Sequence, residues 1–275
     1  MNVLYCGDDG IKYGLLVSIL SLLKNAKPPL HIYLLTIDLD FSKPITDKTA
    51  EYLDKLVKKC YNGNYVRKID ATEVFQANLP TKNLDTIFTK NYFKPCAMLR
   101  LYIDKIPELP DKLLYLDYDV VCRKDPSEFY QTDMEGYEAA GVLDLYGKIF
   151  YHYNFPKTDY MNSGVLLFNM KECKKSGLFP RAVKLCQEKR MMLADQAALN
   201  HAITKRKIMP RKFNEQADHP RSDTVFHHFS NNFKFWPYFH VQKVKPFEID
   251  KVHAILKLTE YDDILDEYNK LKENL

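Results

Sequence analysis

Residues 2–37 read NVLYCGDDGIKYGLLVSILSLLKNAKPPLHIYLLTI, and the pattern of this stretch indicates the fold class. Short apolar runs at Val3–Cys6 and Leu30–Ile37 predict buried strands, and Tyr13–Leu23 between them has the apolar spacing of a helix. A helix between two buried strands is typical of a βαβ unit with parallel strands. We therefore predict an α/β protein with a mostly parallel central sheet flanked by helices.

The same alternation continues along the rest of the chain. Further strands are predicted at Tyr65–Ile69, Leu113–Leu116, Tyr137–Leu143, Val165–Asn169 and Val225–Phe229. Further helices are predicted at Thr46–Cys60 (with Thr46 as a cap), Cys96–Ile106, Leu178–Arg190 and Ala194–Ile203, and an amphipathic closing helix within Val252–Leu275 carries Ile264, Leu265, Tyr268 and Leu271. No Pro/Gly/Ser linker divides the chain, so we expect one domain over residues 1–275, with 245–275 as a C-terminal helical segment.

Composition excludes several classes of protein. The 275 residues carry a formal charge of +4, and the basic residues are dispersed, which argues against a nucleic-acid partner. The six cysteines never approach C-x-x-C spacing, so we expect reduced, buried thiols. The chain shows neither a signal peptide nor an apolar run of about 18 residues, so we predict no transmembrane segment and a cytoplasmic location. Peripheral contact with the inner face of a membrane stays open.

Three predicted strands end in carboxylates, and ligands of parallel sheets bind at the carboxyl ends of strands. Asp8 follows the first strand, Asp38 and Asp40 follow the second, and Asp117 and Asp119 follow the strand at Leu113–Leu116. Alternation along an extended chain puts both carboxylates of D-x-D on one side, where they suit a hard cation. We interpret Asp38 and Asp40 as a solvated loop. Asp117 and Asp119 lie between apolar runs, so either a cation or hydrogen-bond donors must meet them.

A dinucleotide site is disfavoured. The first turn reads Gly7-Asp-Asp-Gly10, which lacks the G-x-G-x-x-G pattern and places acids where a pyrophosphate would be repelled. No P-loop is present.

Several motifs in order resemble one known family. They are VLYCGDD (3–9), MLRLYI (98–103), YLDYDVV (115–121), NSGVLLFN (162–169), DQAALN (195–200) and HHFSNNFKFW (227–236). Together, over roughly residues 2 to 240, they resemble glycosyltransferase family 8, which contains lipopolysaccharide galactosyl- and glucosyltransferases, glycogenin and galactinol synthase. The resemblance implies a GT-A fold and a retaining, UDP-sugar-dependent transferase that uses Mn²⁺ or Mg²⁺.

The resemblance also implies a metal site. Asp117 and Asp119 match the D-x-D motif, whose carboxylates hold the metal and contact the ribose, and His228 matches the third ligand of the family pattern H-x-x-G-x-x-K-P-W. Lys234 matches the lysine of that pattern, which contacts the diphosphate. The cation and Lys234 would neutralise charge on the UDP leaving group. Because His228 must be neutral to bind a metal, we expect activity to fall at acid pH.

Other positions match the family around the donor. They are Asp8 at the uracil, Arg100 near the sugar and phosphate, and Asp144, Asn162, Asp195 and Gln196 around the sugar. Gln196 is expected near the anomeric carbon; an amide is a poor nucleophile, so same-face substitution is easier to defend than a covalent intermediate. Asp195 accepts from a sugar hydroxyl in this interpretation, and the alternative is that it caps the helix that follows.

The chain departs from the family pattern at two positions. Asn231 stands where the family has Gly, and Phe235 stands where it has Pro. Both departures affect the predicted contact with the diphosphate more than the predicted metal binding. The C-terminus also lacks the basic, aromatic tail by which some members sit on membranes.

We therefore predict a retaining hexosyltransferase that moves glucose or galactose to a glycan or glycolipid, such as lipopolysaccharide or another cell-surface glycan. The alternatives are an inactive sugar-nucleotide-binding protein and a glycogenin-like protein that glucosylates itself. The tyrosine-rich segment Tyr146–Tyr160 is the natural acceptor-side loop, either as a stacking surface for sugars or as a packed lid. The sequence displays neither the sugar, nor the acceptor, nor the oligomeric state.

Overall fold

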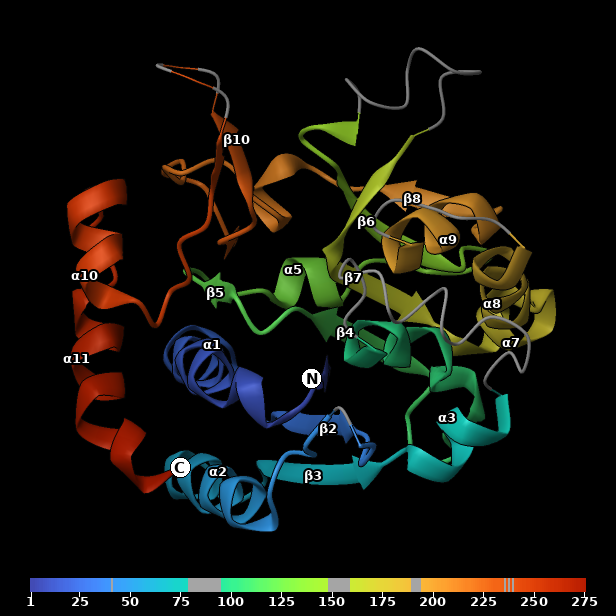
Figure 1. Cartoon of the computed structure of the whole chain (residues 1–275), viewed down its shortest axis with the longest axis horizontal. Helices are drawn as coiled ribbons and strands as arrows, with labels where there is room; N and C mark the ends of the chain where they lie inside the picture. Colours follow the sequence, from blue (N-terminus) through green and yellow to red (C-terminus); the bar gives the residue numbers. More distant parts are fainter. Residues whose placement is uncertain are drawn as a thin grey trace.

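The computed structural model describes residues 1–40, 42–78, 95–147, 159–188, 194–234, 236, 238 and 240–275. A seven-stranded sheet runs through its centre in the order β3-β2-β1-β4-β7-β6-β8 (Figure 1). The strands are β3 (Tyr65–Asp70), β2 (His31–Thr36), β1 (Asn2–Cys6), β4 (Lys112–Leu116), β7 (Met161–Asn169), β6 (Ala139–Leu143) and β8 (Arg206–Ile208). Neighbours are parallel except β7, which is antiparallel to both β4 and β6. The predicted α/β fold with a mostly parallel sheet is confirmed.

Helices cover both faces of this sheet (Figure 1). Those beside the first strands are α1 (Lys12–Asn25), α2 (Asp47–Cys60) and α3 (Thr72–Asn78). Those that follow are α5 (Ser127–Tyr130), α7 (Met170–Ser176), α8 (Leu178–Glu188) and α9 (Ala194–Ala202). Thr46 caps α2, because its side chain accepts from the Thr49 N–H as predicted.

The sheet separates two apolar clusters. Leu114 and Leu116 of β4 belong to the cluster under α1 and α2, whereas Leu113 and Tyr115 belong to the cluster under α8 and α9. Successive side chains of a strand point to opposite faces, so one strand supplies both cores. All four side chains are at most 1% exposed, which leaves the ends of the strand as the places where polar groups meet solvent.

Two short strand pairs lie outside the main sheet. β5 (Val120–Cys122) pairs antiparallel with β9 (Phe226–His228), and Val120 lies opposite His228. β10 (Asn232–Lys234) and β11 (His240–Gln242) form an antiparallel hairpin that projects at the top of Figure 1. The first pair brings His228 next to the D-x-D segment, although more than a hundred residues separate them in sequence.

The stretch predicted as helical around Cys96–Ile106 consists of two 3₁₀ segments, Pro95–Leu101 and Ile103–Lys105, rather than one α-helix. The predicted closing amphipathic helix is confirmed as α11 (Asp262–Leu271), which carries Ile264, Leu265, Tyr268 and Leu271. An interruption separates it from α10 (Ile249–Lys251) and a π-helical turn (Val252–Leu256), and a final 3₁₀ turn (Lys272–Asn274) follows it.

The interruption has a packing cause. Lys257 is left-handed, with φ of 54°, and Leu256, Leu258 and Tyr261 around it are all buried. A continuous helix would carry Leu256 on the opposite side from Leu258 and Tyr261, so tertiary burial overrides helical continuity. α11 then packs on α1, where Tyr268 meets Tyr13 edge-on.

The remaining predictions on elements are met within the described residues, with ends shifted by a few positions. The tyrosine-rich segment lies outside the described residues over 148–158, as do Phe235 and Arg190. The expectation that the cysteines are buried holds for Cys96, Cys122 and Cys173, whereas Cys6 and Cys186 are partly buried and Cys60 at the end of α2 is exposed.

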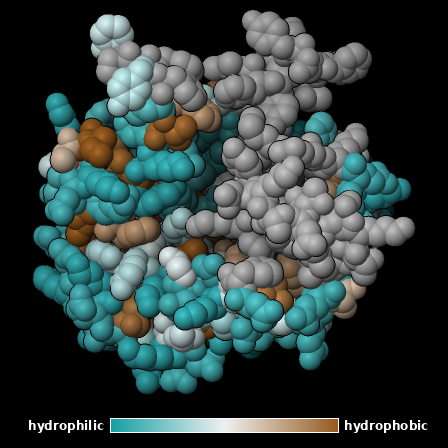
Figure 2. Space-filling view, in the orientation of Figure 1, coloured by the Kyte–Doolittle hydropathy of each residue, from teal (hydrophilic) through white to brown (hydrophobic). Residues whose placement is uncertain are grey.

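No described helix is long and apolar enough to cross a membrane. Among the coloured residues of Figure 2, the surface facing the viewer is largely hydrophilic, with hydrophobic residues in small separate patches. The most exposed large hydrophobic side chains described are Trp236 and Tyr238, at 86% and 69%, between β10 and β11.

Candidate active site

A cavity of about 300 Å³ opens at one edge of the sheet. Asp117 and Asp119 follow β4, whereas Asn162 and Ser163 begin β7. Because β7 runs antiparallel to β4, the start of one strand lies beside the end of the other. Asp144 after β6, two residues of α9 and His228 of β9 complete much of the polar lining. Most of the predicted site residues therefore gather at the carboxyl ends of the strands, as predicted from sequence.

Asp117, Asp119 and His228 form one cluster of potential metal ligands. One ligand atom from each lies within 4.8 Å of the others. His228 Nε2 is 3.3 Å from Asp119 Oδ1 and 3.8 Å from Asp117 Oδ2. Two carboxylates and an imidazole are a donor set for a divalent cation, and three protein ligands leave coordination positions open.

Asn162 sets the tautomer of His228. Its Oδ1 lies 3.1 Å from His228 Nδ1 and also accepts from the Gly164 N–H and Asn214 Nδ2. Its Nδ2 donates to Asp144 Oδ2 at 2.9 Å, which fixes the orientation of the amide. His228 Nδ1 therefore carries a proton, and Nε2 faces the two carboxylates. This is the orientation that metal binding requires.

Gly164 makes room for the imidazole. A Cβ at this position would lie 2.2 Å from His228 Cε1 and 2.6 Å from Nδ1. No side chain fits there without moving the ring. The glycine of the NSG motif is thus required by close approach rather than by backbone conformation.

Asp119 is 5% exposed, and Lys245 stabilises its charge. Lys245 Nζ is 2.5 Å from Asp119 Oδ2 and 3.0 Å from the carbonyl oxygen of Phe229. Burial alone would raise the pKa of Asp119, but Lys245 and His228 outweigh burial and hold that pKa well below its usual range. The carboxylate is therefore ionised and available as a ligand at neutral pH.

Arg100 joins two acids at the floor of the cavity. Its guanidinium lies 2.9 Å from Asp117 Oδ1 and 3.2 Å from Asp195 Oδ2, and it donates to the Ser163 carbonyl at 3.0 Å. Tyr115 lies beneath it, with the guanidinium 4.3 Å from the ring centroid, and its hydroxyl donates to Asp117 Oδ1 at 2.6 Å. Asp117 is thus held by two donors through Oδ1, which leaves Oδ2 directed at His228.

Asp195 and Gln196 begin α9 and line the same cavity. Burial raises the pKa of Asp195, and Arg100 and the backbone N–H groups of Gln196 and Asp195 act in the opposite direction. These backbone contacts keep the capping role open beside the ion pair. Gln196 Oε1 accepts from the Ser163 N–H at 2.9 Å, and its Nε2 donates to Asp144 Oδ2 at 3.3 Å. Its amide is held rigidly at the wall of the cavity.

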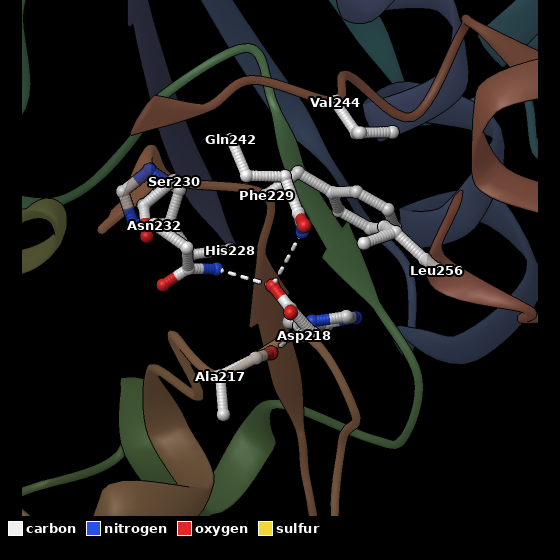
Figure 3. A pocket seen from close by; sticks show the side chains of 10 residues that line it. Ala217, Asp218, His228, Phe229, Ser230, Asn232, Gln242, Val244 and Leu256 are labelled. Carbon is white, nitrogen blue, oxygen red and sulfur yellow. Dashed lines mark hydrogen bonds between the residues drawn. The ribbon is translucent and has the colours of Figure 1, made fainter. Parts of the chain in front are cut away.

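Asp8 and Lys234 do not belong to the described lining of this cavity. Asp8 caps the 3₁₀ turn Asp9–Ile11, accepting from the Gly10 N–H. Lys234 is paired with Asp218. Figure 3 shows Asp218 also accepting from Asn232 and Gln242, at 2.6 and 3.1 Å, so this carboxylate ties both strands of the β10–β11 hairpin to the loop at Ala217.

The second D-x-D pair, Asp38 and Asp40, does not line this cavity. Asp38 and Asp40 are exposed after β2, which agrees with a solvated loop. Lys245 could not be predicted from the sequence, because it belongs to no motif. Tyr115 and Ser163 lie within the recognised motifs, but their contacts in the site form only when distant parts of the chain fold together.

Comparisons with known proteins identify the family. A family model described as glycosyl transferase family 8 matches residues 2–239. The chain belongs to glycosyltransferase family 8. That model ends before Lys245, so this lysine lies outside the matched residues.

Individual relatives of this family 8 glycosyltransferase are distant. Lipopolysaccharide 1,2-glucosyltransferase of Escherichia coli is 27% identical over 86% of this chain and 73% of its own length. Glycosyltransferase GlyA of Streptococcus pneumoniae is 33% identical over 38% of this chain, which spans only 14% of that protein. The galactosyltransferase LgtC, solved with donor and acceptor sugar analogues, covers 100% of both chains with a TM-score of 0.72 and 16% identity. This likeness confirms the predicted GT-A fold.

Proposed function

We propose that this chain transfers a hexose, glucose or galactose, from a UDP-sugar to a glycan or glycolipid acceptor, with retention and with Mn²⁺ or Mg²⁺. The observation that carries the proposal is the Asp117–Asp119–His228 cluster at the wall of the cavity. The oriented His228 lone pair and the space kept by Gly164 fit a bound dication. The family 8 membership supports the reaction class.

The roles of the chain's residues follow from their contacts. A bound cation would supply Lewis-acid stabilisation of the UDP leaving group. Asp117 and Asp119 would hold it through Oδ2 and Oδ1, with Arg100, Tyr115 and Lys245 holding their other oxygens. The roles of Asp8 at the uracil and Lys234 at the diphosphate stay predictions, since Lys234 must first leave Asp218.

Asp144, Asn162 and Asp195 are proposed to orient the transferred sugar. All three line the cavity beside the metal cluster. Gln196 is proposed to face the anomeric carbon. Its amide oxygen is already engaged by Ser163, and an amide is a poor nucleophile, so same-face substitution through an oxocarbenium-like state is favoured over a covalent intermediate.

The acceptor class rests on the relatives. Similar proteins include a lipopolysaccharide glucosyltransferase and a galactosyltransferase. Tyr146 and Tyr160 line the cavity at the ends of the tyrosine-rich segment, which supports the proposal of an acceptor on that side.

The proposal is tested by UDP release from a panel of UDP-sugars, with and without Mn²⁺, using purified protein and Asp119→Asn as the inactive control. We expect release with one hexose donor, dependent on metal and lost in the variant. Anomer analysis of the product by NMR tests retention, and intact-mass measurement tests self-glucosylation. Tight UDP-sugar binding without turnover across diverse acceptors would instead favour a binding protein.

A further inference from the structure

Besides Arg100, Lys245 places a positive charge beside the Asp117–Asp119–His228 cluster. It follows β11, and the buried Val244 beside it anchors this segment (Figure 3). Its ammonium contacts Asp119 Oδ2 and the Phe229 carbonyl, and the side chain is 21% exposed at the wall of the cavity. It is therefore both bonded to a metal ligand and open to whatever enters the cavity.

The contact uses only one oxygen of the carboxylate. Lys245 holds Asp119 Oδ2, whereas Oδ1 faces His228 at 3.3 Å. The ammonium thus leaves the ligand set intact while it competes electrostatically with any cation that shares Asp119. A positive charge at this range opposes a dication and attracts an anion.

Few other positively charged side chains are available to bind an anionic sugar-nucleotide donor. Among the described residues that line the cavity, the permanent cations are Arg100 and Lys245. Arg100 is engaged by Asp117, Asp195 and two backbone carbonyls. Lys234 is held by Asp218 outside this lining. Lys245 has three N–H groups and bonds two described acceptors, so one N–H is left for a further oxygen.

We propose that Lys245 is a donor-binding residue that exchanges partners: it holds Asp119 in the metal-free site and binds the diphosphate once a divalent cation shares that carboxylate. This inference rests on the proposed function. Metal and nucleotide then increase each other's affinity. The bound cation weakens the attraction between Lys245 and Asp119, and the bound diphosphate offsets the repulsion between the cation and Lys245.

The proposal has opposite consequences for the two ligands. Lys245→Met keeps the length of the side chain and removes the charge. We expect Mn²⁺ affinity without nucleotide to rise about tenfold or more, and UDP affinity at saturating Mn²⁺ to fall about tenfold or more. Calorimetry measures both affinities, and electron paramagnetic resonance of free Mn²⁺ checks the first. A merely structural role would weaken both ligands together.

Lys243→Met is the matched control, since it removes the same charge from an exposed side chain two residues away. We expect it to bind both ligands as the wild type does. If Lys245→Met is misfolded by circular dichroism, Lys245→Gln replaces it, because its amide can still donate to the Phe229 carbonyl.

The outcomes separate the two proposals. If the wild type binds Mn²⁺ and UDP but the neutral variants change both affinities in the same direction, or neither, the inference about Lys245 is overturned and the proposed function stands. If the wild type binds neither ligand, the proposed function fails and the inference fails with it.

Discussion

At the scale of single residues, the geometry of the proposed metal site at Asp117, Asp119 and His228 depends on groups outside the ligand set. Asn162 orients His228, Arg100 and Tyr115 hold Asp117, and Lys245 holds Asp119. Such outer partners fix the direction in which each ligand atom points. The geometry of the cluster is therefore more sensitive to its neighbours than the D-x-D motif alone suggests.

Gly164→Ala is predicted to disrupt the cluster without touching a ligand. The new methyl group would overlap His228 Cε1 at 2.2 Å, so the ring must move away from Asp119. We expect Mn²⁺ affinity to fall more than about tenfold, as measured by calorimetry. Gly136→Ala is the control: nothing lies within 4 Å of its Cβ, and its φ of 72° adds strain far from the site. Equal metal binding by wild type and Gly164→Ala would contradict the role assigned to this glycine.

Asn162→Ala tests the tautomer of His228. It removes the acceptor that holds the Nδ1 proton and leaves the imidazole free to turn. We expect Mn²⁺ affinity to fall about 10–100-fold, while Asn162→Asp, which keeps an acceptor oxygen, should retain more of it. Retention of full affinity by the alanine variant would show that His228 is oriented by other contacts.

At the scale of elements, buried carboxylates tie loops to strands. Glu138 precedes β6 and is 1% exposed. Glu138 Oε1 accepts a hydrogen bond from the Arg181 guanidinium. Glu138 Oε2 accepts from the backbone N–H groups of Thr204 and Lys205, at 2.6 and 2.9 Å. Burial would raise the pKa of Glu138, but hydrogen bonds from the Ser176 side chain and from the backbone N–H groups of Lys205 and Thr204 hold it below its usual value. The α9–β8 loop is thereby fixed beside β6.

Glu138→Gln is predicted to lower stability in a pH-dependent way. Because the folded-state pKa is depressed, the ionised carboxylate stabilises the fold above the unfolded-state pKa of about 4.3, and this contribution is lost as pH falls through the folded value. We expect a loss of roughly 2 kcal/mol at pH 7 that shrinks below about pH 4. Urea unfolding at several pH values measures this, with the exposed Glu135→Gln as control. A pH-independent difference would rule out the charge as the cause.

The β10–β11 hairpin is expected to depend on Asp218. This carboxylate accepts from Asn232 of β10 and Gln242 of β11 (Figure 3). It also pairs with Lys234. Asp218→Asn should cost about 1–2 kcal/mol and speed proteolysis within the hairpin, because the charge-assisted bonds are lost. Unchanged proteolysis relative to the exposed control Asp223→Asn would refute this anchor.

At the scale of the whole molecule, the C-terminal segment is bonded to the strand that carries His228. Tyr261 packs against His227, whose Nε2 donates to the Ala217 carbonyl at 2.8 Å. Nδ1 must then accept from the Tyr261 hydroxyl, 2.5 Å away. Burial lowers the pKa of His227 to about 3, so the ring is neutral and this pattern is retained near neutral pH.

Tyr261→Phe is therefore predicted to leave His227 Nδ1 buried without a donor. We expect a loss of about 1–3 kcal/mol in the free energy of unfolding, measured by urea denaturation. Tyr61→Phe removes a hydroxyl from a side chain that is 48% exposed and should change little. Equal stability of both variants would show that the Tyr261–His227 bond contributes nothing measurable.

The amino-acid sequence by itself determined the α/β class, the family and most of the site, because apolar periodicity and short motifs are local properties. Strand ends carrying Asp117 and Asp119 were recognisable from a few neighbouring residues. The NSG, DQ and HH motifs indicated Asn162, Gln196 and His228 in the same way.

Only the tertiary structure decided what lies beside those residues. The pairing of Lys234 with Asp218 and the contact of Lys245 with Asp119 join residues 16 and 126 positions apart in sequence. Such contacts arise from burial and charge pairing across the folded chain, which leave no periodic signal in the sequence. The residues that hold Asp117, Asp119 and His228 in place could therefore be identified only from the assembled sheet and its C-terminal segment.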